Sequence, residues 1–514
     1  MVQDDSYRNI ALHRASYASS SYDYNLTAQL VTDGIVASET PKFLKVSTSG
    51  GSVPRREREW LVDRGDYTSM TLDGTHVEIL FELENGWTEK VDHVKMLGYV
   101  SYLEEEATGG YCIQFEGSDD EMATVKDGYS EGNILGWKSG DEFPGRQLSP
   151  RRHSDPDKSA ALGDRLLPRR LIDLNLDLNP ASCKNKEYSK LKAWLHMQGA
   201  QEWTLVNCDF YHEGKLVDLL SSQYFCSTWM SLGTEQEWVH VDLGVEAEFD
   251  KIVLHWLNRP SGGMIQVSKD GIAWTDLVEL QEADTVEARG KGRYVRVLMD
   301  GSADGKPLML SEIEIWGKGG MKAEAKEEPA NEGNKIILSG GNWKLKRAAE
   351  LDVQGDAISS DGFDDSGWLA ATVPGTVLTS YVNIGAVPDP NHADNLLHIS
   401  DSYFNSDFWY RKEFEMHKPD GERMFLEFDG INWKAEVYFN GKFLGCIEGG
   451  FTRGRFDITK IVEDGVNTLA VKIIKNAHIG AVKEKNEENT GINGGILGAD
   501  NPTFHASIGW DWIS

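Results

Sequence analysis

The stretch Val437-Tyr438-Phe439-Asn440-Gly441 carries the strongest hairpin signal in the chain. Asn-Gly readily takes the positive φ angles of a two-residue turn, and here it lies between runs of alternating residues. Period-two alternation recurs along the chain, as in Val239-His240-Val241-Asp242-Leu243, whereas helical periodicity is nearly absent. We therefore expect an all-β protein made of several β-sandwiches.

The composition limits the possible partners. The chain has 514 residues, enough for several domains, and its 52 basic against 82 acidic residues give a net charge of −30. This charge repels nucleic acid and anionic membrane surfaces but leaves a neutral polysaccharide unaffected. No apolar stretch reaches the length of a membrane span. The five scattered cysteines predict neither a zinc site nor a dense disulfide framework, although Cys112 and Cys208 stay open as a pair.

An ordered series of motifs occupies the last third of the chain. It comprises Trp368, Val373-Pro374-Gly375-Thr376-Val377, Asp389-Pro390, Trp409-Tyr410-Arg411, Phe428-Asp429-Gly430-Ile431, Val437-Tyr438-Phe439-Asn440-Gly441, Phe451-Thr452 and Phe456-Asp457-Ile458-Thr459. This series resembles the N-terminal sugar-binding sandwich of glycoside hydrolase family 2, closest to its β-mannosidase and exo-β-glucosaminidase branch. The resemblance implies a jelly-roll-like, galactose-binding-type domain over residues 335–514.

A second set of strand-like runs lies at both ends of the preceding region. It comprises Asn9-Ile10-Ala11-Leu12, Thr32-Asp33-Gly34, Val239–Leu243, Ile252-Val253-Leu254, Ile265-Gln266-Val267, Tyr294–Leu298 and Ile313–Trp316. Together these runs resemble a discoidin (F5/8 type C) sandwich, the fold of family 32 carbohydrate-binding modules. In that family a Trp-Ser element soon follows Asp-Gly, but its counterpart here, Trp229, comes almost two hundred residues later. We therefore expect an inserted domain.

The insert has strand patterns in the same order as its host. The run Val77–Leu83 parallels Val239–Leu243, and Ile113–Asp119 parallels Ile265–Asp270. This repetition predicts a second discoidin-like sandwich nested in the first, with independent convergence of short patterns as the alternative. The expected borders are a split sandwich at 1–38 plus 221–318, an insert at 39–220, a linker at 319–334 and the sugar-binding domain at 335–514.

The chain ends on an aromatic and acidic element, Gly509-Trp510-Asp511-Trp512. In the family that it resembles, this loop reaches the mouth of a catalytic (α/β)₈ barrel. The resemblance implies that Asp511 bonds sugar hydroxyls at the −1 subsite and that Trp510 or Trp512 forms a hydrophobic wall. Two core tryptophans at the end of a strand are the alternative.

No pair of catalytic carboxylates stands out. A retaining glycosidase needs two rigidly held carboxyl groups, but Asn331-Glu332 lies in the expected linker and Asn486-Glu487 in a polar loop. We expect the non-catalytic, carbohydrate-binding part of a family 2 exo-β-glycosidase that acts on plant or host glycans, needs no cofactor and has its barrel elsewhere in the same polypeptide. A stand-alone carbohydrate-binding or adhesion protein and a structural spacer are the alternatives. The start, Met1-Val2-Gln3-Asp4-Asp5, has no leader pattern, and family habit predicts a secreted or periplasmic bacterial protein.

Further candidates lie in the discoidin-like part. Aromatic residues expected in loops are candidates for stacking on sugar rings, with Arg259 and His255 as partners for hydroxyl groups; core packing is the alternative. These aromatic candidates are Tyr17, Tyr22, Tyr24, Trp229, Trp256 and Trp274. Family resemblance also implies a structural Ca²⁺ held by Asp33 and Glu312, with solvated surface carboxylates as the alternative.

Overall fold

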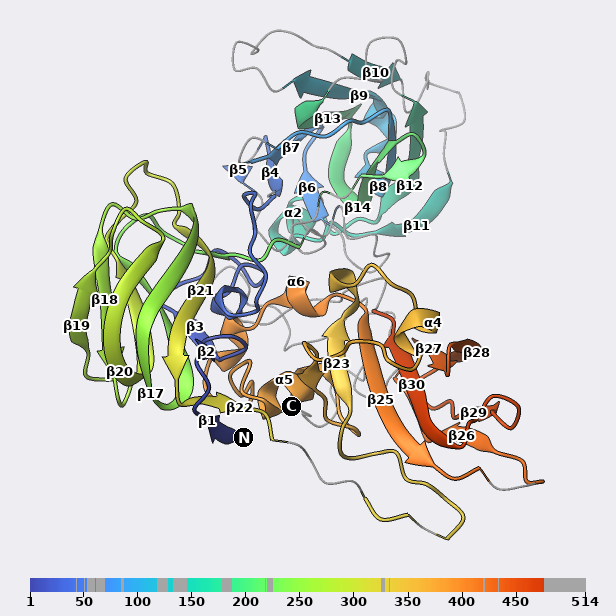
Figure 1. Ribbon diagram of the computed structural model, residues 1–514. Coiled ribbons are helices and arrows are strands. Elements are labelled where there is room, and N and C mark those ends of the chain that lie inside the picture. Colours follow the sequence, from blue (N-terminus) through green and yellow to red (C-terminus); the bar gives the residue numbers. More distant parts are fainter. Residues whose placement is uncertain are drawn as a thin grey trace. The chain divides into compact units, whose positions relative to one another are not determined.

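The computed structural model of the protein describes residues 1–475, except for positions 43, 50, 53–60, 62–69, 85–86, 118–127, 133–145, 178–186, 218, 220–224, 325–328, 332, 419–420 and 433. Strands make up 48% of the structure and helices 9%, in several sheets of which none closes. The predicted all-β sandwich architecture is confirmed (Figure 1). The chain forms two compact units: Met1–Thr40 with Phe225–Ala477, here called the host unit, and Pro41–Tyr224, here called the inserted unit. These borders lie close to the predicted insert at 39–220.

The first sandwich of the host unit, which we call the host sandwich, is built around the 22-residue strand β17. Its elements are β1 (Val2–Asp4), β2 (Arg8–Asn9), β3 (Ser16–Ala18), η1 (Ala28–Val31), β16 (Trp229–Met230), β17 (Glu237–Asn258), β18 (Gly263–Ser268), β19 (Thr275–Glu279), β20 (Thr285–Met299), β21 (Met309–Lys318) and β22 (Gly320–Lys322). The first half of β17 pairs with β3 and β20, and its second half pairs with β20 and β21. A register shift between Asp242 and Ala247 separates the halves, and Gly244 there takes a φ of 77°.

The expected linker at 319–334 is partly a strand. Gly320, Met321 and Lys322 form β22, which pairs antiparallel with β1 at the start of the chain. Three residues at the start of the predicted linker are thus held in a strand pair. The composition-based reading missed this because the partner strand lies more than 300 residues away in the sequence, beyond the reach of local patterns.

The second sandwich of the host unit follows. Its elements are β23 (Lys344–Arg347), η3 (Ala348–Glu350), α4 (Gly355–Ile358), β24 (Leu369–Ala370), α5 (Val377–Asn383), η4 (Asn395–His398), α6 (Asp401–Phe404), β25 (Phe408–Met416), β26 (Phe425–Phe428), β27 (Lys434–Phe439), β28 (Lys442–Glu448), β29 (Gly454–Asp457) and β30 (Gly465–Ile473). Six strands pair in the order β24-β23-β25-β30-β27-β28, and β26 pairs with β29. Asn440 and Gly441, with φ values of 44° and 73°, join β27 to β28 as the predicted hairpin turn.

The two sandwiches of the host unit share a buried, hydrogen-bonded contact. Ser400 Oγ donates to the carbonyl oxygen of Asn25 at 2.6 Å, and Ser400 N donates to Gln29 Oε1 at 2.9 Å. Leu30 of η1 belongs to the hydrophobic core of the second sandwich. These contacts explain why the two predicted domains form one unit.

The inserted unit consists of two sheets. Its elements are β4 (Leu44–Thr48), β5 (Gly51–Ser52), β6 (Met70–Asp73), β7 (His76–Leu83), β8 (His93–Tyr102), η2 (Glu104–Glu106), β9 (Thr108–Gly117), β10 (Gly128–Gly132), β11 (Gln147–Arg151), α2 (Pro156–Ala161), β12 (Leu167–Asp177), β13 (Tyr188–Gln198), β14 (Ala200–His212) and β15 (Lys215–Leu216). One sheet has the order β10-β9-β13-β7-β4-β5. The other has the order β11-β12-β8-β14-β15, with β6 also paired to β14.

The strand order of the insert repeats that of its host. The order β9-β13-β7 corresponds to β18-β20-β17. The next strand of the insert, β8, takes the place of the second half of β17, because β8 pairs with β14 as that half pairs with β21. The two sandwiches therefore share one topology, and their surfaces can be compared position by position.

Candidate functional site

One outer sheet face of the host sandwich carries a continuous group of aromatic side chains. Alternate residues of β17 point into the core, so Trp238 and His240 lie on the opposite face. Tyr17 of β3 lies opposite His240, Tyr294 of β20 lies opposite Asp242, and Trp274 directly precedes β19. We call Tyr17, Trp238, His240, Trp274 and Tyr294 the aromatic face. All five side chains are half-buried.

His240 lies at the centre of the aromatic face. Its ring centroid is 5.0 Å from that of Tyr17, 5.5 Å from Trp274 and 5.9 Å from Tyr294. The Trp238 indole stacks on it at 5.1 Å with an interplanar angle of 9°. Such contacts hold the rings in a fixed arrangement, so the surface that they form is already ordered before any ligand binds.

Polar groups surround these rings. The Arg296 guanidinium lies 4.0 Å above the centroid of Trp274, and its Nε donates to Gln266 Oε1 at 2.8 Å. Arg293 forms a two-pronged pair with Asp242, at 2.8 and 2.9 Å. Flat apolar rings bordered by fixed donors and acceptors match the alternating C–H and hydroxyl surfaces of a sugar.

His240 is neutral at ordinary pH. Burial lowers its pKa to about 4, and the positive charges of Arg296 and His398 act in the same direction, while Asp242 opposes them. Within the part of the chain that the structure describes, no group bonds the buried Nδ1 of His240. The aromatic face therefore presents an uncharged centre between the charged pairs at its border.

The corresponding face of the inserted unit is built differently. In β7 and β13, Trp194 lies opposite Glu78, and Lys190 lies opposite Glu82. Trp194 Nε1 donates to Glu78 at 2.8 Å, Lys192 Nζ lies 2.8 Å from Glu78, and Lys190 Nζ lies 3.2 Å from Glu82. We call these five residues the charged face. It offers one indole, and that indole is engaged by its own strand pair.

The residues predicted to bind sugar do not form one site. Trp229 has no exposed surface and donates its Nε1–H to Ser20 O at 2.9 Å, so it is a core residue without a free face. Trp256 and Arg259 do lie together, with the guanidinium 5.9 Å from the indole centroid, but Trp256 packs on the core and Arg259 pairs with Asp284.

Of the remaining candidates, some lie on the aromatic face and others lie elsewhere. His255 lies on the second half of β17, and its Nε2 is 2.9 Å from Oε1 of Glu314 on β21. Tyr22 and Tyr24 are half-buried. Tyr17 and Trp274 do meet, on the aromatic face. The element Trp510-Asp511-Trp512 lies outside the described residues.

Sequence reasoning missed Trp238, His240 and Tyr294. The signal is present in the sequence, because Val239, Val241 and Leu243 are predicted to lie in one strand and their alternate neighbours must lie on the opposite face. The outward-facing residues of that strand include Trp238 and His240, which lie on the same face as Tyr17.

Asp33 and Glu312 form a buried pair. They are 6% and 2% exposed, so the alternative of solvated surface carboxylates is wrong. Asp33 accepts from Ser227 Oγ at 2.6 Å, and Glu312 accepts from the Gly34 amide at 3.2 Å. Burial raises the pKa of Asp33 to about 8; burial, followed by the charge of Asp33, raises that of Glu312. Burial thus favours the protonated form of both carboxyl groups.

Two further findings concern the expectations from composition. Among the described residues, none of the helices has the length and apolar character needed to cross a bilayer. Cys208 is a buried free thiol, and the side chain of Cys112, its candidate partner, lies outside the described part of the structure.

Two family models match separate parts of the chain. Residues 343–514 match the glycosyl hydrolase 2 galactose-binding domain-like model, and residues 200–313 match the F5/8 type C domain model. The first range covers the second sandwich of the host unit. The second range runs from β14 of the inserted unit through the first half of β21.

Several known enzymes are similar to part of the chain. It is 34% identical to a mannosylglycoprotein endo-β-mannosidase of Lilium longiflorum over 194 residues, which are 35% of this chain and 19% of that protein. It is 28% identical to an exo-β-D-glucosaminidase of Streptomyces avermitilis over 185 residues, 35% of this chain and 18% of that protein. The chain thus spans less than a fifth of the length of these relatives.

A solved structure of an exo-chitosanase from Amycolatopsis orientalis shows 29% identity, covers 26% of this chain and 16% of that one, and has a TM-score of 0.25. The family models, together with the motifs and the observed sandwiches, give the domain content. The chain contains a galactose-binding-like N-terminal domain of the glycoside hydrolase family 2 type and an F5/8 type C domain.

Proposed function

We propose that this chain is the carbohydrate-binding part of a family 2 glycoside hydrolase and that the aromatic face binds its glycan. The observation that carries this proposal is the group of four half-buried rings around a fifth, His240, bordered by Arg296 and Arg293. The charged face of the inserted unit shows that the shared topology does not require such rings. The net charge of −30 further favours a neutral or cationic polymer over an anionic one.

The expected strength of binding follows from the contact. Covering ~80 Å² of a sugar's apolar face contributes about 2 kcal/mol, and each hydrogen bond adds about 1 kcal/mol. One such site binds with a Kd near the millimolar range. Retention on a polymer then depends on several contacts made along the same chain of sugars.

The glycan is a β-linked mannoside or glucosaminide. This part of the proposal rests on the printed names of the relatives, an endo-β-mannosidase and an exo-β-D-glucosaminidase. The catalytic barrel belongs to the same polypeptide. Trp510, Asp511 and Trp512 complete its −1 subsite, with Asp511 bonding hydroxyls and the indoles forming the wall.

Asp33 and Glu312 hold a structural Ca²⁺ in this proposal. Their all-oxygen chemistry suits Ca²⁺, and the ion would offset the repulsion between two buried carboxylates. Ca²⁺ should raise the Tm of the wild-type protein but not that of Asp33→Asn, as measured by differential scanning calorimetry. An equal shift in both proteins contradicts the assignment.

The binding proposal is tested by calorimetric titration with β-1,4-linked oligosaccharides of mannose and of glucosamine. Trp274→Ala should lower the affinity at least fivefold, because it removes a stacking surface and the support under Arg296. Trp194→Ala on the charged face is the matched control and should leave the affinity unchanged. Absence of binding to every oligosaccharide indicates a spacer, and equal loss in both variants places the site elsewhere.

A further inference from the structure

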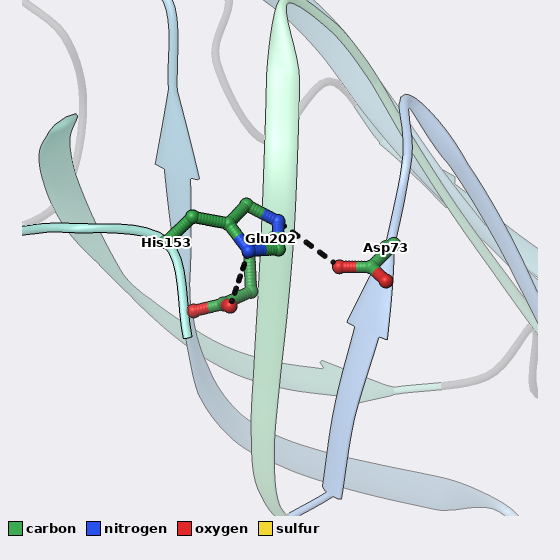
Figure 2. Close-up of side chains that lie close together, drawn as sticks. All are labelled: Asp73, His153 and Glu202. Atoms are coloured by element: carbon green, nitrogen blue, oxygen red, sulfur yellow. Dashed lines mark ion pairs between the residues drawn. The ribbon is translucent and has the colours of Figure 1, made fainter. Parts of the chain in front are cut away.

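A buried histidine of the inserted unit lies between two carboxylates (Figure 2). The side chain of His153 is 2% exposed, and its Nε2 lies 3.2 Å from Asp73 Oδ1. Its Nδ1 lies 3.5 Å from Glu202 Oε2. One ligand atom from each of the three residues lies within 4.8 Å of the others. Nothing in the proposed glycan binding uses this cluster.

The strand pairing forces the two carboxylates together. Asp73 of β6 and Glu202 of β14 are direct partners in an antiparallel pair, so their side chains share one face. Like charges at such positions destabilise a sheet unless a cation lies between them. Lys158 pairs with Asp73, but among the described residues Glu202 has no lysine or arginine partner. Glu202 is held instead by Ser154, whose amide N–H donates to Glu202 Oε2 at 2.8 Å and whose hydroxyl donates to the same oxygen. Both donors are neutral, so they supply no full positive charge to offset Glu202.

The loop before α2 fixes the state of the imidazole. The amide N–H of Asp155 donates to His153 Nδ1 at 3.1 Å, so this nitrogen carries a lone pair. Nε2 then carries the proton and donates it to Asp73. That lone pair is directed at the Asp155 N–H, while Glu202 Oε2, a second acceptor, lies 3.5 Å from the same nitrogen.

This geometry matches a common metal arrangement. A histidine that binds a metal through one nitrogen usually donates its other N–H to a carboxylate, which orients the ring. Two ligands bound at about 2.1 Å to a tetrahedral ion are about 3.4 Å apart, close to the separation of Nδ1 and Oε2. An imidazole among the ligands favours Zn²⁺ over Ca²⁺ or Mg²⁺, which prefer oxygen alone.

We propose that this cluster is a binding site for a divalent transition-metal ion, with Zn²⁺ the best fit. His153 Nδ1 and Glu202 are the ligands, Asp73 orients the imidazole, and water completes the coordination. The ion takes the place of the Asp155 N–H at Nδ1. Binding ties the loop before α2 to β14 and thereby stabilises the inserted unit.

The test is calorimetric titration of Zn²⁺ into the chain after dialysis against a chelator. The wild-type protein should bind one ion at this site, and its Tm should rise. His153→Asn and Glu202→Gln should weaken binding at least tenfold, and Asp73→Asn should weaken it about tenfold by releasing the ring. His93→Asn is the matched control and should bind like wild type, because His93 lies in the same unit beside a single carboxylate, Asp177.

A second measurement keeps the test decisive if a variant fails to fold. X-ray absorption of the Zn²⁺-loaded wild-type protein should show nitrogen and oxygen ligands, one imidazole and no sulfur. Three results overturn the proposal: no stoichiometric binding by the wild-type protein, unchanged affinity in folded His153→Asn and Glu202→Gln, or a sulfur ligand at the ion.

Discussion

The host sandwich and the inserted unit share a strand order but present different outer faces. On the host sandwich, β17 and β20 carry the aromatic face around His240. On the inserted unit, the corresponding strands β7 and β13 carry the charged face, in which Lys192 and Glu78 pair at 2.8 Å. Inward, the two are alike, since each buries a tryptophan, Trp229 at 0% and Trp203 at 1% exposure. In these alternating strands, the residues that face the core specify the fold, whereas the residues on the opposite face are free to serve a function.

The largest expected effect tests the shared cores. Trp229→Ala and Trp203→Ala should each lower the free energy of unfolding by about 3–5 kcal/mol, because each leaves a cavity in a closed core. Trp194→Ala, on the charged face, should lower it by less than about 1 kcal/mol. Urea unfolding followed by circular dichroism measures all three. An equal cost at Trp194 would show that the charged face is not a solvated surface.

The next effect concerns pH. The unfolded pKa of His240 is near 6.5 and its folded pKa is about 4, so the unfolded state binds the additional proton between these values. The stabilisation is complete above pH 6.5 and is lost as the pH falls toward 4, by about 2–3 kcal/mol. Asp242 opposes this shift, whereas Arg296 and His398 support it.

His240→Phe should remove this part of the pH dependence, because it keeps a ring on the aromatic face and removes the titrating group. The midpoint of thermal unfolding, measured from pH 4 to pH 7, provides the comparison. A variant whose midpoint follows the wild-type curve throughout that range would rule out His240 as the source.

A smaller effect is expected at the border of the aromatic face. Arg296→Met removes the cation above Trp274 and the bond to Gln266, and should weaken glycan binding by about 1 kcal/mol, or fivefold in Kd. The same change at Lys192, over Trp194 on the charged face, should leave binding unaltered. Titration of both variants sharpens the contrast between the faces. An equal loss of glycan affinity in Lys192→Met and Arg296→Met would contradict this contrast.

The smallest effect lies on the charged face. Lys192→Met breaks a half-buried cross-strand ion pair with Glu78 and should destabilise the inserted unit by no more than about 1 kcal/mol. Salt should shrink this difference further. Urea unfolding at low and high salt measures it. A loss of several kcal/mol that is insensitive to salt would mean that the pair is structural rather than solvated.

Much of the fold follows from local sequence. The alternation in β17 and the Asn440-Gly441 turn both depend on neighbouring residues, and both are observed. The nested order of strands was also readable, because a repeated topology repeats its patterns. What was missed depends on distant contacts, such as the pairing of β1 with β22.

The site was harder to predict for the same reason. A tryptophan serves equally well in a core or on a binding surface, and only packing distinguishes Trp229 from Trp274. Asp33 and Glu312 are buried where segments far apart in the sequence meet, since Asp33 bonds Ser227 and Glu312 bonds Gly34. The cluster of Asp73, His153 and Glu202 depends on the register of β6 against β14, which no local pattern specifies.

The most direct test of the account is side-chain footprinting of the chain with and without a bound β-linked oligosaccharide. Trp238, Trp274 and Tyr294 should be protected by the sugar, whereas Trp194 should be labelled equally in both samples. Protection of Trp194, or of Trp256 and Arg259 alone, would contradict the claim that the aromatic face binds the glycan.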